Sequence, residues 1–512
     1  MKDFPFLSIL TLLPLVGAAV VAFIPKTRGQ LAKTIALGWS VVVLALSVVM
    51  WIAFQAGGDR FQFRESYQWI PTWDARFTFA TDGIALVMLL LIALLVPLVI
   101  LASWNDIDES KRSVPAYFAL LLTLECTMIG VFAAADVFLF YVFFEVMLVP
   151  MYFIIGSYGG QRRQYAAVKF FLYSLVGGLF MLAAVIGLWV VGGHTFDWNN
   201  LKDVSGAFET DTARWLFLGF FIAFAVKAPF FPFHTWLPDA GVAAPAPAAA
   251  LLVGVLDKVG TFGILRYCLP LFPEASRWFA PAALILGVIG IIYAALLAVG
   301  QNDLKRLVSY TSIAHFGFIG IGIFAFTTQA GTGSVLYMVN HGLATGLLFL
   351  VVGMFVARRG SSLVSDFGGA GKLVPVLAGV LFFAGLASLA LPGTAPFISE
   401  FLVLIGTFTT HKVYAVIATL GIILAAAYVL WMVQRTTQGT LNPTLTEVPA
   451  MRKDITLREK VVVAPLVLLL LLLGFYPKPV TDVINPAVEQ TMQDVGTTDP
   501  APSAVANGRV AR

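Results

Sequence analysis

Seven ionisable side chains lie inside apolar stretches long enough to cross a membrane, and two histidines lie in similar stretches. They are Glu125, Glu145, Lys169, Lys227, Asp257, Lys258 and Glu400, with His315 and His341. A charge at the bilayer centre costs about 2.5–3.5 kcal/mol on insertion scales, so such residues usually mark an ion or proton path. One isolated residue of this kind could equally be a static salt bridge or lie at the lipid edge. Nine together favour a path for protons.

Three of these residues stand in the motifs that carry most of this prediction. Glu145 lies near the middle of a predicted span, too deep to reach the interface, and burial disfavours its charged form unless a cation is close. Lys227 is followed by Pro229 and Pro232, and Glu400 is preceded by Pro392, Gly393 and Pro396. Proline removes a backbone donor, which predicts a broken helix at both places. Broken helices in membranes line cavities rather than lipid.

The remaining candidates differ in strength. His315 and His341 are predicted to relay protons between the lysines and Glu400, because histidine titrates near neutral pH. Glu125, Lys169 and Asp257 are secondary candidates, and Lys169 could instead extend its ammonium to the interface. Asp257 adjoins Lys258, but successive helical residues point about 100° apart, so the sequence does not predict a pair. His194, His234 and His411 are interpreted as structural.

The composition requires lipid as the solvent for most of the chain. Of 512 residues, 59% are hydrophobic and 12% charged, whereas a soluble domain is about 25% charged. The mean hydropathy is +0.89. The net charge of +4 does not indicate nucleic acid, and the two cysteines form no Cys-x-x-Cys pair. The sequence therefore predicts an all-α polytopic membrane protein with about 14 transmembrane helices and no metal site.

The spans are organised as two repeats. Pro232-Phe233 resembles Pro396-Phe397 at an offset of 164 residues, and the same offset links Tyr173 to Tyr337 and Gly178 to Gly342. Five helices in each copy, an odd number, would invert the second copy in the membrane. The predicted parts are 1–114 (three spans and an extramembrane hairpin at 59–82), 115–267 (first repeat), 279–434 (second repeat), 435–489 (a loop and the last span) and 490–512 (a disordered tail).

The loop charges give an orientation. The loops that follow the odd-numbered spans carry more Lys and Arg, and fewer acids, than the loops and termini on the other side. The positive-inside rule then predicts that both termini lie outside.

Two motifs resemble a known family. Phe144-Glu145 with Leu148-Val-Pro150-Met151-Tyr, and the run from Lys227-Ala-Pro through His234-Thr-Trp-Leu-Pro-Asp239-Ala, look like the proton-conducting, antiporter-like subunits of respiratory complex I. Multi-subunit cation/proton antiporters share this family, and the resemblance covers about residues 80–480. An acid at the second break, Glu400, resembles the M-type chains, where the other types usually carry lysine. Gly241 and Ala243 depart from the His and Glu usual in relatives.

The resemblance implies a function and a setting. The chain would translocate protons as a subunit of NADH:quinone oxidoreductase, with Glu145 and Lys227 as input pair, Lys258 as centre, His315 and His341 as relay, and Glu400 as terminal donor. It would hold no cofactor and do no redox chemistry itself, while FMN, iron–sulfur clusters and quinone would belong to partner subunits. L- and N-type chains would flank it in the bacterial inner membrane. The alternatives are an antiporter subunit and a passive scaffold.

Overall fold

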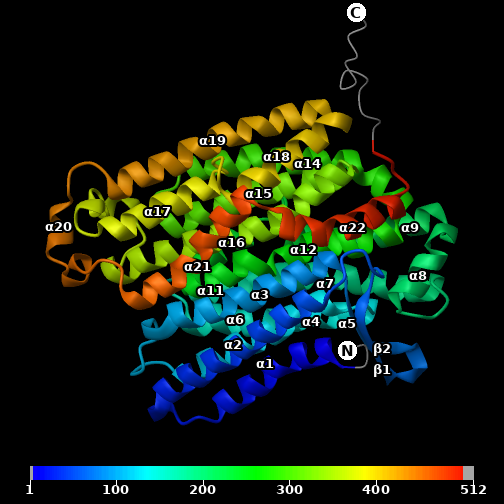
Figure 1. The fold of residues 1–512 in the computed structure, drawn as a ribbon, viewed down its shortest axis with the longest axis horizontal. Helices are drawn as coiled ribbons and strands as arrows, with labels where there is room; N and C mark the ends of the chain where they lie inside the picture. Colours follow the sequence, from blue (N-terminus) through cyan, green and yellow to red (C-terminus); the bar gives the residue numbers. More distant parts are fainter. Residues whose placement is uncertain (1–3, 500–512) are drawn as a thin grey trace, which may run out of the picture.

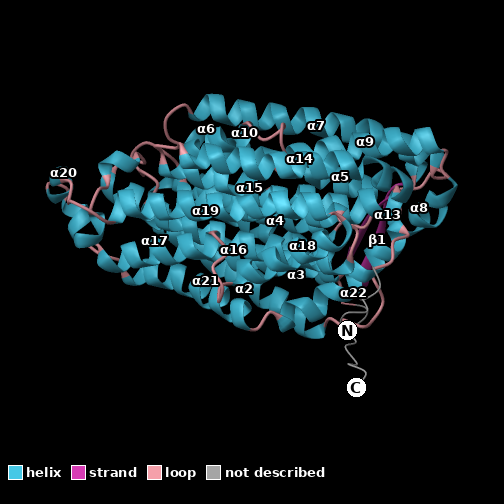
Figure 2. Ribbon diagram, turned by 90° about the horizontal axis from the view of Figure 1, so that it is seen from above, coloured by secondary structure: helices cyan, strands magenta, loops and turns pink. Residues whose placement is uncertain are grey.

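A computed structural model describes residues 4–499 of the chain. Its long helices run side by side, with the N-terminus, the β-hairpin and α22 at one end and α20 at the other (Figure 1). Seen at 90° to this view, the helices again lie side by side in one elongated bundle (Figure 2).

The N-terminal part contains three helices and a hairpin. The helices are α1 (Phe6–Ala22), α2 (Gly29–Ala53) and α3 (Gly83–Ala102), and the strands are β1 (Gln62–Ile70) and β2 (Ala75–Thr81). The strands pair antiparallel from Gln62 opposite Thr81 to Ile70 opposite Ala75, with two register shifts between them. Asp74 takes the left-handed conformation at the turn, with φ 50°, a conformation that Asp tolerates better than most residues. The two paired strands match the hairpin predicted over 59–82, whose position outside the membrane stays a prediction.

The middle of the chain forms a second group of helices. They are α4 (Val114–Ala133), α5 (Val137–Val146), α6 (Leu148–Tyr158), α7 (Arg163–Val191), α8 (Trp198–Val204), α9 (Thr210–Lys227), α10 (Trp236–Ala243), α11 (Ala246–Leu251), α12 (Lys258–Gly263) and α13 (Leu269–Leu271). Two π-helical turns, Leu252–Leu256 and Ile264–Cys268, join α11, α12 and α13 into one continuous span.

The C-terminal part contains nine helices among the described residues. They are α14 (Pro273–Val299), α15 (Leu304–Phe324), α16 (Thr328–Arg359), α17 (Pro375–Ser388), α18 (Ala395–Thr410), α19 (Lys412–Thr437), α20 (Pro443–Thr446), α21 (Leu457–Phe475) and α22 (Lys478–Val495). Helix α14 lies against α15 over much of its length, and α16 likewise lies against α18.

Length and composition identify the spans. Over residues 4–499, ten helices are long and apolar enough to cross a membrane, and up to twelve if each bent pair is one span; α1 and α18 are shorter apolar helices. The all-α polytopic fold with broken helices is confirmed, and the number fourteen stays a prediction.

One prediction at the level of elements is wrong, and two short helices are missing from the prediction. The sequence predicts a disordered tail from residue 490, but α22 continues to Val495; residues 500–512 lie outside the described part. This helix is held by Asp494, which pairs with Arg60 at 2.5 Å and with Lys202 at 3.4 Å. The helices α8 and α10 were not predicted, because both are too short to give an apolar signal of their own.

Candidate functional site

The first helix break places Lys227 at the end of α9. Pro229 has no N–H to offer the carbonyl of Ala225, so Phe230 N donates to Ala225 O instead, at 2.9 Å. The freed carbonyl of Val226 accepts the indole N–H of Trp236, also at 2.9 Å. Lys227 is 1% exposed, and its Nζ lies 5.2 Å from the ring centre of Phe144. The predicted break is confirmed, and it leaves a buried lysine at a helix end.

Glu145 lies on the last turn of α5, next to Phe144. Its carboxylate is pressed against α7 at Gly178, where an added Cβ would lie 1.5 Å from Glu145 Oε1. Glu145 Oε1 and Lys227 Nζ each lack a hydrogen-bonding partner among residues 4–499. No hydrogen bond therefore joins the two side chains. The structure thus places the predicted input residues as neighbours around Phe144.

Lys258 occupies the centre of the bundle with no exposed surface. Its Nζ hydrogen-bonds His341 Nδ1 at 2.7 Å, and it also donates to the carbonyl of Val253. Asp257 Oδ1 lies 3.2 Å from the same Nζ. The sequence argument against an Asp257–Lys258 pair is therefore wrong. The long lysine side chain bends back along the wide π-helical turn before it, and there it meets the shorter side chain of its neighbour.

A chain of polar side chains leads from Lys258 to Glu400. His341 and His315 lie with ring centres 5.2 Å apart. His315 Nδ1 is hydrogen-bonded to the hydroxyl of Tyr337 at 2.6 Å, and this hydroxyl donates to Glu400 Oε2 at 2.9 Å. Sequence reasoning missed Tyr337. His341, His315, Tyr337 and Glu400 are all buried. Both histidine Nε2 atoms lack a hydrogen-bonding partner among residues 4–499, so the two rings are neighbours without a hydrogen bond between them.

The second break turns the chain so that Glu400 faces Tyr337. Pro392 cannot donate a backbone bond, and Leu391 N reaches back five residues to Leu386 O at 3.0 Å. Gly393 takes φ +92°, a conformation that favours glycine. The helix α18 then begins at Ala395, with Pro396 in its first turn. Asn340 on α16 donates to Ala395 O at 2.8 Å and holds this start in place.

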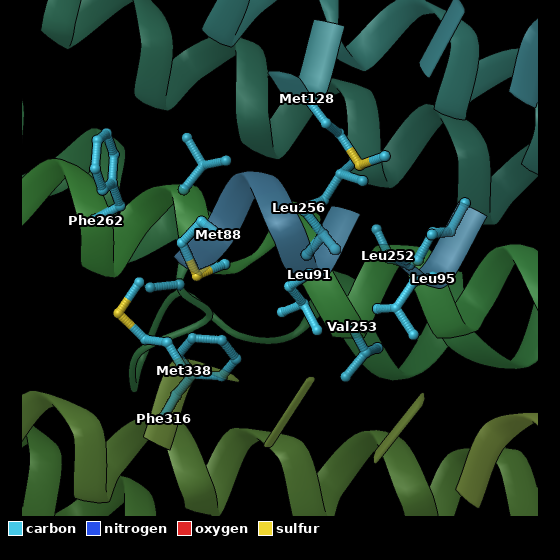
Figure 3. Close-up of a cluster of buried hydrophobic side chains, with 14 of the residues drawn as sticks. Met88, Leu91, Leu95, Met128, Leu252, Val253, Leu256, Phe262, Phe316 and Met338 are labelled. Carbon is cyan, nitrogen blue, oxygen red and sulfur yellow. The ribbon is translucent and has the colours of Figure 1, made fainter. Parts of the chain in front are cut away.

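Apolar side chains surround the central segment. Met88, Leu91 and Leu95 from α3, Met128 from α4, Phe316 from α15 and Met338 from α16 gather around the turn that precedes Lys258 (Figure 3). The ring centre of Phe316 is 5.2 Å from Lys258 Nζ. Lys258 is therefore bordered by apolar side chains as well as by its polar partners.

Two secondary candidates lie apart from this chain. Lys169 Nζ binds Asp239 Oδ2 at 2.7 Å, and Arg306 binds the other oxygen of the same carboxylate at 3.0 Å. These ion pairs join α7, α10 and α15. Glu125 is fully buried in α4, and neither of its carboxylate oxygens has a hydrogen-bonding partner in the described part of the chain.

The 164-residue offset between the two predicted repeats relates two tyrosines that make similar hydrogen bonds. Tyr173 accepts a hydrogen bond from Thr235 Oγ1 at 2.8 Å, just after the first break. Tyr337, which the offset pairs with Tyr173, bonds Glu400 just after the second break. This agrees with the predicted repeat, whose numbering stays a prediction.

The residues around Gly241 leave little room for a side chain at this position. A Cβ added at Gly241 would lie 2.3 Å from Ser309 Oγ. Lys305 Nζ donates to the carbonyls of Val242 and Ala244, both at 2.6 Å. Ser309 and Lys305 thus fill the space beside the start of α11, where a larger side chain at 241 would clash.

Over residues 4–499, His, Cys, Asp and Glu form no group of three or more that could hold a metal ion.

Comparisons with known proteins give a consistent result. Residues 134–425 match the family model described as "NADH:quinone oxidoreductase/Mrp antiporter, TM". NADH-quinone oxidoreductase subunit M from Mycobacterium tuberculosis is 47% identical, over 98% of this chain and 97% of that protein. NADH-ubiquinone oxidoreductase chain 4 from Arabidopsis thaliana is 39% identical, over 95% and 97%.

Solved structures agree with these matches. A chain of respiratory complex I from Thermus thermophilus with bound NADH superposes with a TM-score of 0.85 at 30% identity, covering 96% of this chain and all of that one. A chain of the Mrp complex from Dietzia superposes with a TM-score of 0.80 at 22% identity, covering 96% of this chain and 52% of that one. The second likeness shows the fold alone.

Proposed function

Because the chain belongs to the NADH:quinone oxidoreductase/Mrp antiporter family of membrane subunits, we propose that it is the M-type, proton-translocating subunit of a respiratory complex I. The observation that carries this proposal is the buried polar chain from Lys258 through His341, His315 and Tyr337 to Glu400. The acid at the far end of this row of side chains, Glu400, fits a group that releases protons. The M-type relatives align with this protein over nearly its full length.

On this proposal, protons enter at Glu145 and Lys227. A change in a neighbouring subunit would draw the charge of Glu145 away from Lys227, and the freed charge of Lys227 would then act on Lys258. At 4 Å and an effective dielectric constant of about 20, two unit charges interact by about 4 kcal/mol. A repulsion of this kind lowers the proton affinity of Lys258, and so favours transfer of its proton to His341 and onward by His315 to Glu400.

The setting follows from the same proposal. The energy would come from NADH oxidation and quinone reduction in partner subunits, which would carry the FMN, the iron–sulfur clusters and the quinone site. This chain would hold no cofactor. L-type and N-type chains would lie on either side of it in a bacterial inner membrane, with both termini outside.

A second candidate function is a subunit of a multi-subunit cation/proton antiporter. The matched family includes such subunits, and the Mrp chain shares the fold. Glu400 favours complex I, because the antiporter chains resemble the types with lysine at this position. An antiporter subunit would exchange protons for cations without NADH.

The test is Glu145→Gln in the assembled complex, with Glu274→Gln as the matched control. Glu274 pairs with Arg214 at 2.7 Å on the partly exposed surface. In inverted membrane vesicles with equal complex content, we expect Glu145→Gln to lose at least about 90% of NADH-driven proton uptake together with quinone reduction. The control should keep both. Unchanged proton uptake and quinone reduction in Glu145→Gln would refute the proposal.

A further inference from the structure

Asp257 is a buried carboxylate that the path described above does not use. It has no exposed surface. Its Oδ1 lies 3.2 Å from Lys258 Nζ, whereas its Oδ2 is buried without a hydrogen-bonding partner among residues 4–499. A buried polar atom left unpaired destabilises the folded state, so most buried polar atoms in native proteins have a partner. The free oxygen therefore calls for a physical reason.

The backbone gives Asp257 and Lys258 an unusual arrangement. Asp257 N donates to Leu252 O, five residues back, at 3.3 Å. This π-helical spacing widens the turn, and the ammonium of Lys258 reaches back to Val253 O. Such π-turns cost stability and are common at functional sites. Both ionisable side chains of this turn are thereby directed to one small buried volume.

The helix α12 touches the end of α9, where Lys227 lies. A Cβ added at Gly260 would lie 2.4 Å from Phe224 O and 2.6 Å from Ala228 N. Gly260 is three residues after Asp257, and residues three apart lie on neighbouring parts of one helix face. Asp257 therefore lies about one turn from the contact between α12 and the peptide that follows Lys227.

We propose that Asp257 is a proton-carrying residue between Lys227 and Lys258: Oδ2 receives the proton, and rotation of the carboxyl group about its Cβ–Cγ bond then turns the protonated oxygen toward Lys258. This inference rests on the proposed function and adds a step to its path. The ammonium of Lys227 gives a proton to the carboxylate, which leaves a neutral amine and a neutral acid. The acid then gives its proton to the neutral amine of Lys258, which restores the carboxylate and forms the ammonium. The proton and charge balance closes over the two steps.

A static role is the alternative. Asp257 would then stay ionised and only hold Lys258 in its charged form. The two roles differ in one observable, because a proton carrier is protonated during turnover and a static counter-ion is not. Infrared difference spectroscopy detects the C=O stretch of a protonated carboxyl group.

The experiment compares Asp257→Asn and Asp257→Glu in the assembled complex, with Glu145→Gln measured in parallel. Asp257→Asn keeps the volume and polarity of the side chain but cannot carry a proton. We expect it to pump at least tenfold more slowly and to lose one carboxyl band from the turnover-induced difference spectrum. Asp257→Glu keeps a carboxyl group and should retain pumping, with that band shifted in frequency.

The outcomes separate this inference from the proposed function. A loss of pumping in Glu145→Gln with wild-type pumping in Asp257→Asn overturns the role of Asp257 alone. Wild-type pumping in Glu145→Gln overturns the proposed function. If Asp257→Asn does not assemble, Asp257→Glu decides the matter. An unshifted carboxyl band in that variant overturns the inference, and a shifted band supports it.

Discussion

Tyr337→Phe tests the link between the histidines and Glu400. The hydroxyl of Tyr337 lies 2.6 Å from His315 Nδ1 and 2.9 Å from Glu400 Oε2, and the residue has no exposed surface. The substitution removes one oxygen and leaves the ring in place. If the angle between these two hydrogen bonds at the oxygen is roughly 110°, His315 Nδ1 and Glu400 Oε2 lie about 4.5 Å apart. Without the oxygen they are too far apart for a direct hydrogen bond.

The magnitude follows from the lost hydrogen bond. A hydrogen bond to a charged group contributes about 1.5–3 kcal/mol, and about 1.4 kcal/mol corresponds to a factor of ten. We therefore expect proton transfer to Glu400, and NADH-driven proton uptake with it, to fall about 10- to 100-fold. The assay is the initial rate of dye quenching in inverted vesicles, normalised to assembled complex.

Tyr267→Phe is the matched control. Tyr267 is equally buried, and its hydroxyl donates to Ala134 O at 3.1 Å, away from the polar chain. The Tyr267→Phe variant also loses a buried hydroxyl oxygen, and it should keep at least half of the wild-type rate of proton uptake. A Tyr337→Phe variant that pumps within about twofold of wild type would refute the reasoning, as would equal losses in both variants.

One further prediction concerns Gly178. Gly178→Ala places a methyl group 1.5 Å from the present position of Glu145 Oε1. We expect the displaced carboxylate to cost most of the proton uptake, while Gly379→Ala, with open space around it, leaves uptake unchanged in the same vesicle assay.

The helix breaks could be predicted from the sequence because their cause is local. Pro229 and Pro392 remove a donor from the backbone ladder wherever they stand in a helix, so the break follows from one residue. Lys227 and Glu400 were recognisable for the same reason, since a charge in an apolar segment stands out against its neighbours. The fold class followed from composition alone, since this much apolar surface needs lipid around it.

Contacts between distant segments could not be predicted in the same way. Tyr337 is an ordinary residue for an apolar helix, and only the approach of α18 to α16 makes its hydroxyl part of the chain. Lys169 looked like a free charge because its partner, Asp239, is 70 residues away. The Asp257–Lys258 pair was excluded by assuming regular α-helical geometry, and the π-helical turn at Leu252–Leu256 has no reliable sequence signal.

The arrangement of the two histidines bears on how the proposed path avoids a leak. His341 uses Nδ1 to bond Lys258, and His315 uses Nδ1 to bond Tyr337. The Nε2 atoms of both rings are buried without hydrogen-bonding partners in the described part of the chain. On the proposed path, each histidine therefore holds a fixed partner on its own side, and transfer between the rings needs a rearrangement. A continuous line of fixed hydrogen bonds would conduct at all times, whereas on the proposed path this interruption requires a histidine ring to reorient before a proton crosses from His341 to His315.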